Sequence, residues 1–183
     1  MTRRRASALW TLVLLVSVSL GWAGSAWASH RWGCWKYADY YIQFYNGCTG
    51  NYYTYVQQEA KTDSNSWSPY TDVFLNPITA SGTTDHLNCY NGNYGFNGWL
   101  GIAEIRRYSG CTILEGRCRL NQSYLDNAAY GYTTTNKKHV TCQEIGHLFG
   151  LNHQYASNTC MNDSILSQPQ PNTHDRDLVN SIY

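Results

Sequence analysis

Side chains that can bind a metal ion or move a proton are concentrated in one short stretch near the end of the chain. Gln143 and His147 are four positions apart, so a helix would place their side chains on one face, with Glu144 beside it. Gly150 can adopt the left-handed conformation that ends a helix, and the chain could then turn back and bring His153 toward His147. The spacing therefore predicts two imidazoles and one amide around a single metal ion, next to a carboxylate, as a hydrolytic zinc site requires.

The stretch resembles the long zinc motif of the metzincin metallopeptidases, His-Glu-x-x-His-x-x-Gly-x-x-His followed by a Met-turn. Four positions match at their places, namely Glu144, His147, Gly150 and His153. Gln143 stands where the family has its first histidine ligand. Met161 follows where a Met-turn would lie, and residues 172–183 resemble the closing helix of matrixin-type domains. The resemblance is sharpest over residues 140–183.

This resemblance implies a secreted, zinc-dependent endopeptidase that hydrolyses peptide bonds with metal-activated water. Glu144 would be the general base, and Met161 would form an apolar floor under the metal ligands. His147 and His153 would hold one Zn²⁺ ion, with Gln143 as the third ligand. The implied fold is α+β, a metzincin-like single domain. It would contain a twisted mixed β-sheet with a covering helix, a central active-site helix, a Met-turn and a C-terminal helix.

Gln143 supports two interpretations. In the first, its amide oxygen replaces an imidazole nitrogen, which leaves the charge of the site unchanged but lowers its affinity for zinc. In the second, the site is catalytically impaired, and the chain is a metzincin-like protein that binds a peptide or a partner through the same cleft. The metal content of the purified protein distinguishes the two.

The first 28 residues have the pattern of a secretory signal peptide. A basic start at residues 3–5 precedes an apolar run over 8–20 and a small-x-small cleavage signal at residues 26–28. Removing 28 of the 183 residues leaves 155, residues 29–183, which suits one extracellular domain. We expect this domain to be a monomer with a peptide or protein substrate and no membrane contact after cleavage.

The amino-acid composition also indicates which kinds of binding partner to expect. The whole chain has 13 basic and 12 acidic residues, and three of the basic residues are arginines of the signal segment. The mature chain therefore has ten basic and twelve acidic residues and is close to neutral, so nucleic acid is not expected as a partner. Sixteen tyrosines are consistent with an amphipathic surface or, alternatively, with an aromatic groove for polymeric substrates, and we favour the first interpretation. No pattern in the sequence assigns a site to structural calcium.

All seven cysteines lie in the predicted mature chain, where the oxidising environment favours disulfides. The odd number leaves at least one unpaired inside the molecule. Cys142–Cys160 is the best pair, because the bond would join the predicted helix to the segment of Met161. Cys111–Cys118 could close a hairpin and Cys48–Cys89 could join two strand ends. Cys34–Cys48 is doubtful, because a strand over 36–45 would hold its ends about 30 Å apart.

The elements that must position the site follow from local patterns. Strands are expected over 35–46, over 72–77 where Pro77 ends the run, over 85–90, over 99–105 and over 112–121 with a break at residues 115–116. Helices are expected over 52–67 and 136–149, with a loop over 126–135. The resemblance to metzincins implies that the 99–105 strand is the edge strand, whose backbone could bind an extended substrate by strand addition. Gly101 would let a substrate backbone approach or, as we favour, would mark a bulge.

Overall fold

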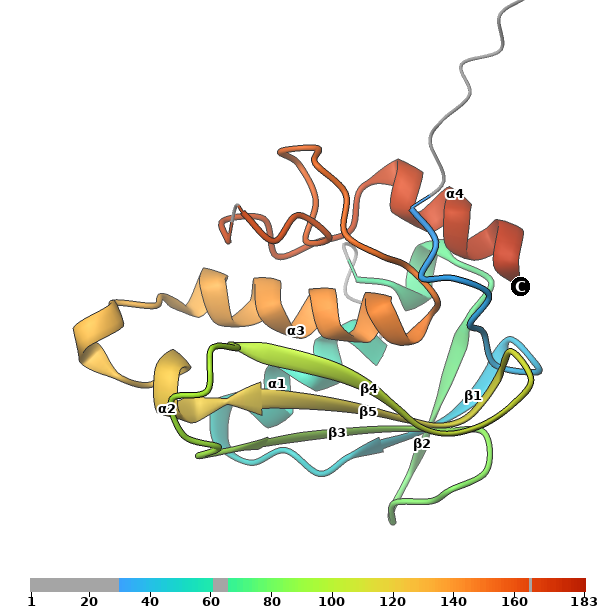
Figure 1. Cartoon of the computed structure of the whole chain (residues 1–183), viewed down its shortest axis with the longest axis horizontal. Helices are drawn as coiled ribbons and strands as arrows, with labels where there is room; N and C mark the ends of the chain where they lie inside the picture. The colour runs from blue at the N-terminus through green and yellow to red at the C-terminus, as the bar shows by residue number, and fades with distance from the viewer. Residues whose placement is uncertain (1–29, 61–65, 165) are drawn as a thin grey trace, which may run out of the picture.

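The computed structural model describes residues 30–60, 66–164 and 166–183, so the predicted signal peptide lies outside it. The chain forms a five-stranded mixed sheet with helices packed on it (Figure 1). The elements in chain order are β1 (Tyr41–Asn46), α1 (Gly50–Ala60), β2 (Phe74–Ile78), β3 (His86–Gly92), β4 (Gly101–Ser109), β5 (Thr112–Asn121), α2 (Gln122–Leu125), α3 (Thr134–Leu148) and α4 (Thr173–Ile182). Among the described residues, no helix is long and apolar enough to cross a bilayer. The α+β fold class is confirmed.

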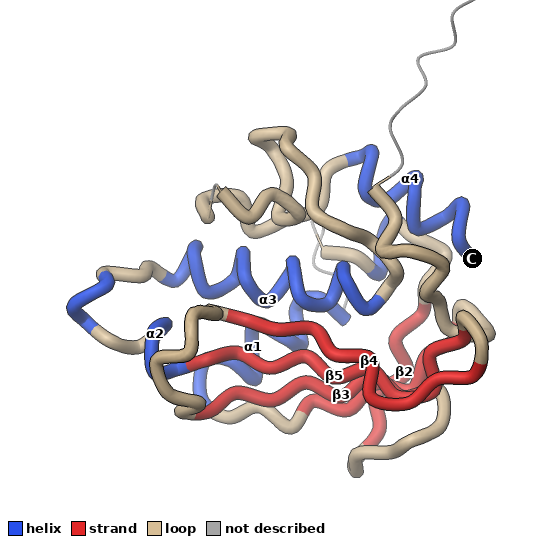
Figure 2. Tube along the Cα trace, viewed as in Figure 1, coloured by secondary structure: helices blue, strands red, loops and turns tan. Residues whose placement is uncertain are grey.

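The strands lie in the order β2-β1-β3-β5-β4, and only the β4–β5 pair is antiparallel. β4 is therefore an edge strand, as expected for the 99–105 segment. Pro77 does not end β2, which continues to Ile78, because β2 is the opposite edge and a missing N–H is tolerated there. Figure 2 shows α1 and α3 packed against the sheet, where they also contact each other.

Two strand predictions were wrong in detail. The first strand begins at Tyr41 rather than at residue 35, because Lys36 forms only an isolated bridge to Thr112. β5 is continuous through Gly116, and the irregularity lies in β4, between Ile105 and Tyr108. Gly116 leaves space for packing: a Cβ atom there would lie 2.4 Å from the hydroxyl of the buried Tyr37. The glycine makes room for a core side chain rather than breaking a strand.

The helix predicted over 136–149 is α3, which begins two residues earlier. Thr133 caps its N-terminus and forms a capping box with Asn136. After the helix, Gly150 has φ +93°, and a Cβ atom on it would lie 2.3 Å from the Trp35 carbonyl oxygen. Only glycine fits this tight turn, which redirects the chain toward His153. The helix predicted over 52–67 is α1; residues 61–65 of that prediction lie outside the described residues.

The disulfide predictions were partly right. Cys142–Cys160 is present, and the second bond joins Cys34 to Cys111. The pairs Cys111–Cys118 and Cys48–Cys89 are wrong, since the cysteines at 48, 89 and 118 are free thiols in the core. Cys111 lies in the turn between β4 and β5, where its carbonyl accepts a hydrogen bond from Lys36 N. The disulfide partner of Cys111 is thus Cys34, which belongs to the N-terminal segment and is distant in sequence.

Replacing Cys142 and Cys160 together by serine should lower the free energy of unfolding by about 3 kcal/mol, because the bond closes a loop with a sequence separation of 18. Urea unfolding followed by circular dichroism measures the loss. The pair Cys34→Ser and Cys111→Ser is the comparison, and its separation of 77 residues should make the loss larger. Equal losses in the two double variants would contradict the loop-closure argument.

Candidate metal and catalytic site

The structure brings His147 and His153 together, as the spacing predicted. His147 lies in the last turn of α3, and the turn at Gly150 returns the chain so that the two Nε2 atoms are 3.1 Å apart. Their ring planes meet at 65°. Two nitrogens that share a tetrahedral zinc ion, with bonds of about 2.0–2.1 Å, lie about 3.4 Å apart. The observed separation is close to that value.

The other ring nitrogens determine what the facing atoms can do. His147 Nδ1 lies 2.9 Å from the Leu151 carbonyl oxygen, which can only accept a hydrogen bond, so Nδ1 carries the hydrogen and Nε2 presents a lone pair. His153 Nδ1 lies 3.6 Å from Asp163 Oδ2, a carboxylate that favours the same tautomer. When both rings have this tautomer, two lone pairs face each other, an arrangement that a cation between them would stabilise.

A proton on His147 is a poor candidate for that cation. Burial of the His147 ring lowers its pKa to about 4, with a further lowering from the neighbouring His153, while the hydrogen bond to the Leu151 carbonyl opposes the shift. His147 is therefore neutral near pH 7. A neutral imidazole with a fixed tautomer is the form that binds a transition metal.

Glu144 is buried between α3 and the edge strand β4. Gly101 makes this possible, since a Cβ atom there would lie 2.6 Å from the Glu144 side chain and 2.5 Å from Val140. Burial raises the pKa of the Glu144 carboxyl to about 8, and a hydrogen bond with the Ala103 backbone partly opposes the rise. From the sequence, Gly101 was interpreted either as room for a substrate backbone or as a bulge. In the structure, side chains of α3 fill the space beside Gly101, and neither interpretation describes it.

Gln143 is 7% exposed, and its Nε2 atom has no hydrogen-bond partner. The amide oxygen and nitrogen are distinguished only by their partners, so the unpaired position could equally present the oxygen. Among the described residues, no hydrogen bond joins Gln143 to either histidine, and no group of three or more His, Cys, Asp or Glu side chains is arranged to hold a metal ion. The potential ligand set is thus two imidazoles and a buried amide, one of whose polar atoms lacks a hydrogen-bond partner.

Met161 packs under the end of the helix. The Met161 side chain is fully buried. Its sulfur would lie 2.5 Å from a Cβ atom built on Gly146, the residue before His147. The Cys142–Cys160 bond fixes the preceding residue to α3. Met161 therefore lies against the last turn of α3, beside Gly146, and its role as an apolar floor stays a prediction.

Sequence reasoning missed the contribution of the N-terminal segment. His30 Nε2 lies 3.2 Å from Oδ1 of the fully buried Asp175 on α4, and the Trp32 ring packs edge-on against His147. The Asp175 carboxylate also accepts hydrogen bonds from Thr159 and from the backbone N–H of Asn172. The contacts of His30 with Asp175 and of Trp32 with His147 join residues more than 100 positions apart, so no local pattern indicates them.

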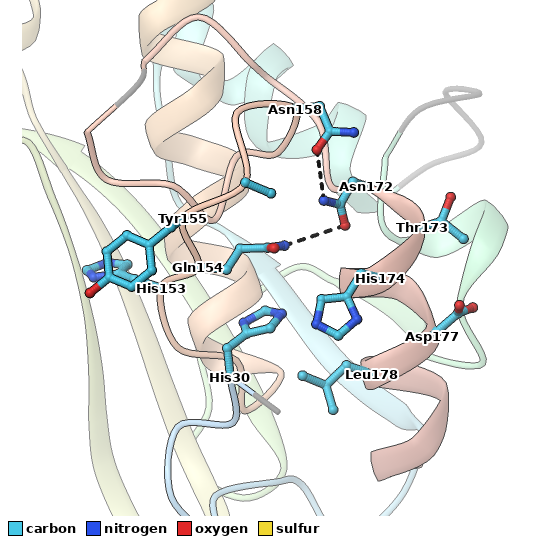
Figure 3. Close-up of a pocket in the computed structure, with 11 residues that line it drawn as sticks. His30, His153, Gln154, Tyr155, Asn158, Asn172, Thr173, His174, Asp177 and Leu178 are labelled. Carbon is cyan, nitrogen blue, oxygen red and sulfur yellow. Dashed lines mark hydrogen bonds between the residues drawn. The ribbon is translucent and has the colours of Figure 1, made fainter. Parts of the chain in front are cut away.

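A cavity of about 780 Å³ opens beside His153, between residues 153–158 and the start of α4. Figure 3 shows the rings of His30 and His174 facing one another across it. Gln154 reaches toward Asn172 on the opposite wall, at 3.4 Å. The cavity shares His153 with the histidine pair, so a molecule bound at the pair has adjacent space.

No protein-family model matches the sequence, and no curated protein matches it. The assignment of function therefore depends on the residues and their arrangement.

Proposed function

We propose that the chain is a secreted, zinc-dependent endopeptidase of the metzincin type. The observation that carries the proposal is the approach of two imidazole Nε2 atoms to 3.1 Å, at the end of a helix that also bears the buried Glu144. The fold supports it coarsely, as an α+β domain with a mixed sheet and an exposed edge strand.

His147 and His153 would hold the ion, with Gln143 as the third ligand through its amide oxygen. The Gln143 side chain supports this role, since its buried atom placed as Nε2 has no hydrogen-bond partner, and such an atom is costly unless something binds it. Met161 would support the ligands from below without touching the ion.

A bound zinc ion would polarise the scissile carbonyl and acidify a water molecule. Glu144 would take a proton from the attacking water and deliver it to the leaving amine, as a general base and then a general acid. Burial raises the pKa of its carboxyl to about 8 and so favours the protonated form at neutral pH, whereas a neighbouring cation would favour the carboxylate that a general base requires. The edge of β4 pairs with the extended substrate through backbone hydrogen bonds and holds it beside Glu144.

Secretion is part of the proposal. Two disulfides are consistent with an oxidising compartment, and the signal peptide predicted over residues 1–28 would deliver the chain there. Mass spectrometry of the secreted chain tests it, with Ser29 as the expected first residue.

The second candidate is a non-catalytic relative that binds a peptide through the same cleft, and it is favoured by Gln143 at the first ligand position. Zinc content together with chelator-sensitive cleavage of a denatured protein substrate separates the two. Stoichiometric zinc with cleavage supports the peptidase. Zinc-free protein with an unchanged fold and no cleavage supports the binding module.

Replacing Asp163 by asparagine should weaken zinc binding by about tenfold, because the carboxylate beside His153 Nδ1 holds the metal-binding tautomer. A tenfold loss of affinity is at the lower end of the roughly 10- to 100-fold range for removing such a partner, since the Asp163 and His153 side chains are both about half exposed. Competition with a zinc-sensitive dye measures the affinity. Asp177→Asn, on α4 at the cavity rim, is the control and should leave it unchanged; equal effects of the two variants would argue against this role for Asp163.

A further inference from the structure

The first residues that the structure describes form a short extended segment beside the candidate site, and we call residues 30–36 the N-terminal strap. In Figure 1 the strap, drawn in blue, runs from beside α4 past the end of α3 to the turn between β4 and β5. It contacts the turn that precedes His153 and also the turn between the two strands. The strap therefore connects the histidine pair to a distant part of the sheet.

One end of the strap forms hydrogen bonds with the turn after α3. The Trp32 N–H donates to the Gly150 carbonyl oxygen at 2.7 Å, and the Asn152 N–H donates to the His30 carbonyl oxygen at 2.5 Å. The His30 ring adds a third bond, from its Nδ1 to the Asn152 carbonyl oxygen at 2.7 Å, since a carbonyl oxygen can only accept. These bonds fix the backbone of the turn immediately before His153.

The strap also supports His147, the other member of the pair. The Leu151 carbonyl, which accepts the hydrogen bond from His147 Nδ1, belongs to a residue that forms an antiparallel bridge with Arg31. The Trp32 ring packs edge-on against the His147 ring, with centres 5.9 Å apart. The orientation of one imidazole and the backbone that carries the other thus both depend on contacts with the strap.

A disulfide fixes the opposite end of the strap. Cys34 is bonded to Cys111 in the turn between β4 and β5, and the Lys36 N–H donates to the Cys111 carbonyl oxygen at 3.2 Å. Both of these cysteines are exposed, whereas Cys142 and Cys160 are fully buried. Exposed disulfides are the ones that external thiols reduce, so Cys34–Cys111 should be reduced well before Cys142–Cys160.

We propose that Cys34–Cys111 is a reducible disulfide that positions the histidine pair through the N-terminal strap. With the bond intact, the strap is fixed at both ends and holds the turn before His153. With the bond reduced, the strap detaches more often, and the fraction of molecules in which the two imidazoles face each other falls. The apparent affinity for a metal ion falls in proportion to that fraction. The effect on metal binding rests on the proposed function; the control of the turn by the strap does not.

The reductant is a dithiol, either a small molecule or a protein. One of its thiolates attacks a sulfur of the disulfide and forms a mixed disulfide, and the other cysteine leaves as a thiolate and takes up a proton. The second thiol of the reductant then displaces the remaining cysteine. The protein gains two thiols, and the dithiol loses two hydrogens and becomes a disulfide. An oxidised dithiol restores the bond by the reverse steps.

Amide hydrogen exchange of the metal-free mature chain, followed by NMR, tests the inference without zinc. The oxidised chain is compared with a chain treated with dithiothreitol and alkylated, and with a Cys34→Ser, Cys111→Ser double variant. Mass spectrometry should find two alkylated cysteines in the treated chain, with Cys142–Cys160 intact. We expect the Asn152 amide to exchange about tenfold faster or more in both altered chains, because the strap opens locally.

The ring nitrogen signals of His147 provide a second readout in the same samples. They should report a single tautomer in the oxidised chain and an average of two tautomers after reduction, because the Leu151 carbonyl is then no longer held in place. Leu75→Ala is the control, since Leu75 is a core residue of β2 and its loss destabilises the whole fold without removing a strap contact. It should change neither the Asn152 exchange rate nor the His147 signals.

Zinc affinity, measured by competition with a dye after the reductant has been removed, should be about tenfold lower in the reduced, alkylated chain. Unchanged exchange after reduction, the same acceleration in Leu75→Ala, or equal zinc affinities of the two chains would each overturn the inference. Local acceleration in a chain that takes up no zinc would leave the control of the turn standing and remove the proposed function. Zinc-dependent cleavage with unchanged exchange after reduction would do the reverse.

Discussion

Glu144→Gln is expected to reduce peptide cleavage by about 10³-fold, which lies within the range for loss of a general acid–base group. Glutamine has the same shape and can keep the hydrogen bond with the Ala103 backbone, but it cannot accept a proton from water or pass one to the leaving amine. Since the residue is not a zinc ligand in the proposed site, its loss should affect the reaction and not the metal.

The measurement is the rate of cleavage of a quenched fluorescent peptide library, with zinc content determined on the same samples. Glu115→Gln is the control, because Glu115 is also a buried glutamate but lies on β5, where it pairs with Arg117. It should retain cleavage. Activity that survives in Glu144→Gln, with zinc still bound, would place the catalytic group elsewhere.

Gln143→His should tighten zinc binding by at least about tenfold, equivalent to about 1.4 kcal/mol. Imidazole nitrogen is a better donor to zinc than an amide oxygen, and the substitution does not change the formal charge of the ligand set. The position is 7% exposed and its amide nitrogen has no hydrogen-bond partner, so the new ring would break no hydrogen bond of that nitrogen.

Isothermal titration of the metal-free variant with zinc, in competition with a chelator of known affinity, gives the change. Gln58→His on α1 adds a histidine to another helix and should leave zinc affinity unchanged. If Gln143→His also leaves it unchanged while the fold is intact, residue 143 does not face the metal, and the ligand set must be revised.

Local patterns were enough to predict the elements that carry the site. The helix was found from its apolar periodicity, and the turn after it from Gly150, a position where any Cβ would collide with the Trp35 carbonyl. The approach of His153 to His147 followed from that turn. Cys142–Cys160 was predictable because the bond joins two segments that the motif already places together.

Contacts between distant segments could not be predicted. The Cys34–Cys111 bond depends on the N-terminal segment reaching the β4–β5 turn, and nothing near either cysteine encodes that approach. The contact of His30 Nε2 with the Asp175 carboxylate is of the same kind. Glycines in strands were also ambiguous: Gly101 and Gly116 could mark bulges, but the structure uses them to admit Glu144 and Tyr37 into the core.

The zinc content of the purified mature chain is the most direct test of the histidine pair as a metal site. We expect about one zinc per chain by inductively coupled plasma mass spectrometry, falling to background in a His147→Ala, His153→Ala double variant. A correctly folded chain that contains no zinc, and takes up none after incubation with excess zinc, would contradict the proposed function.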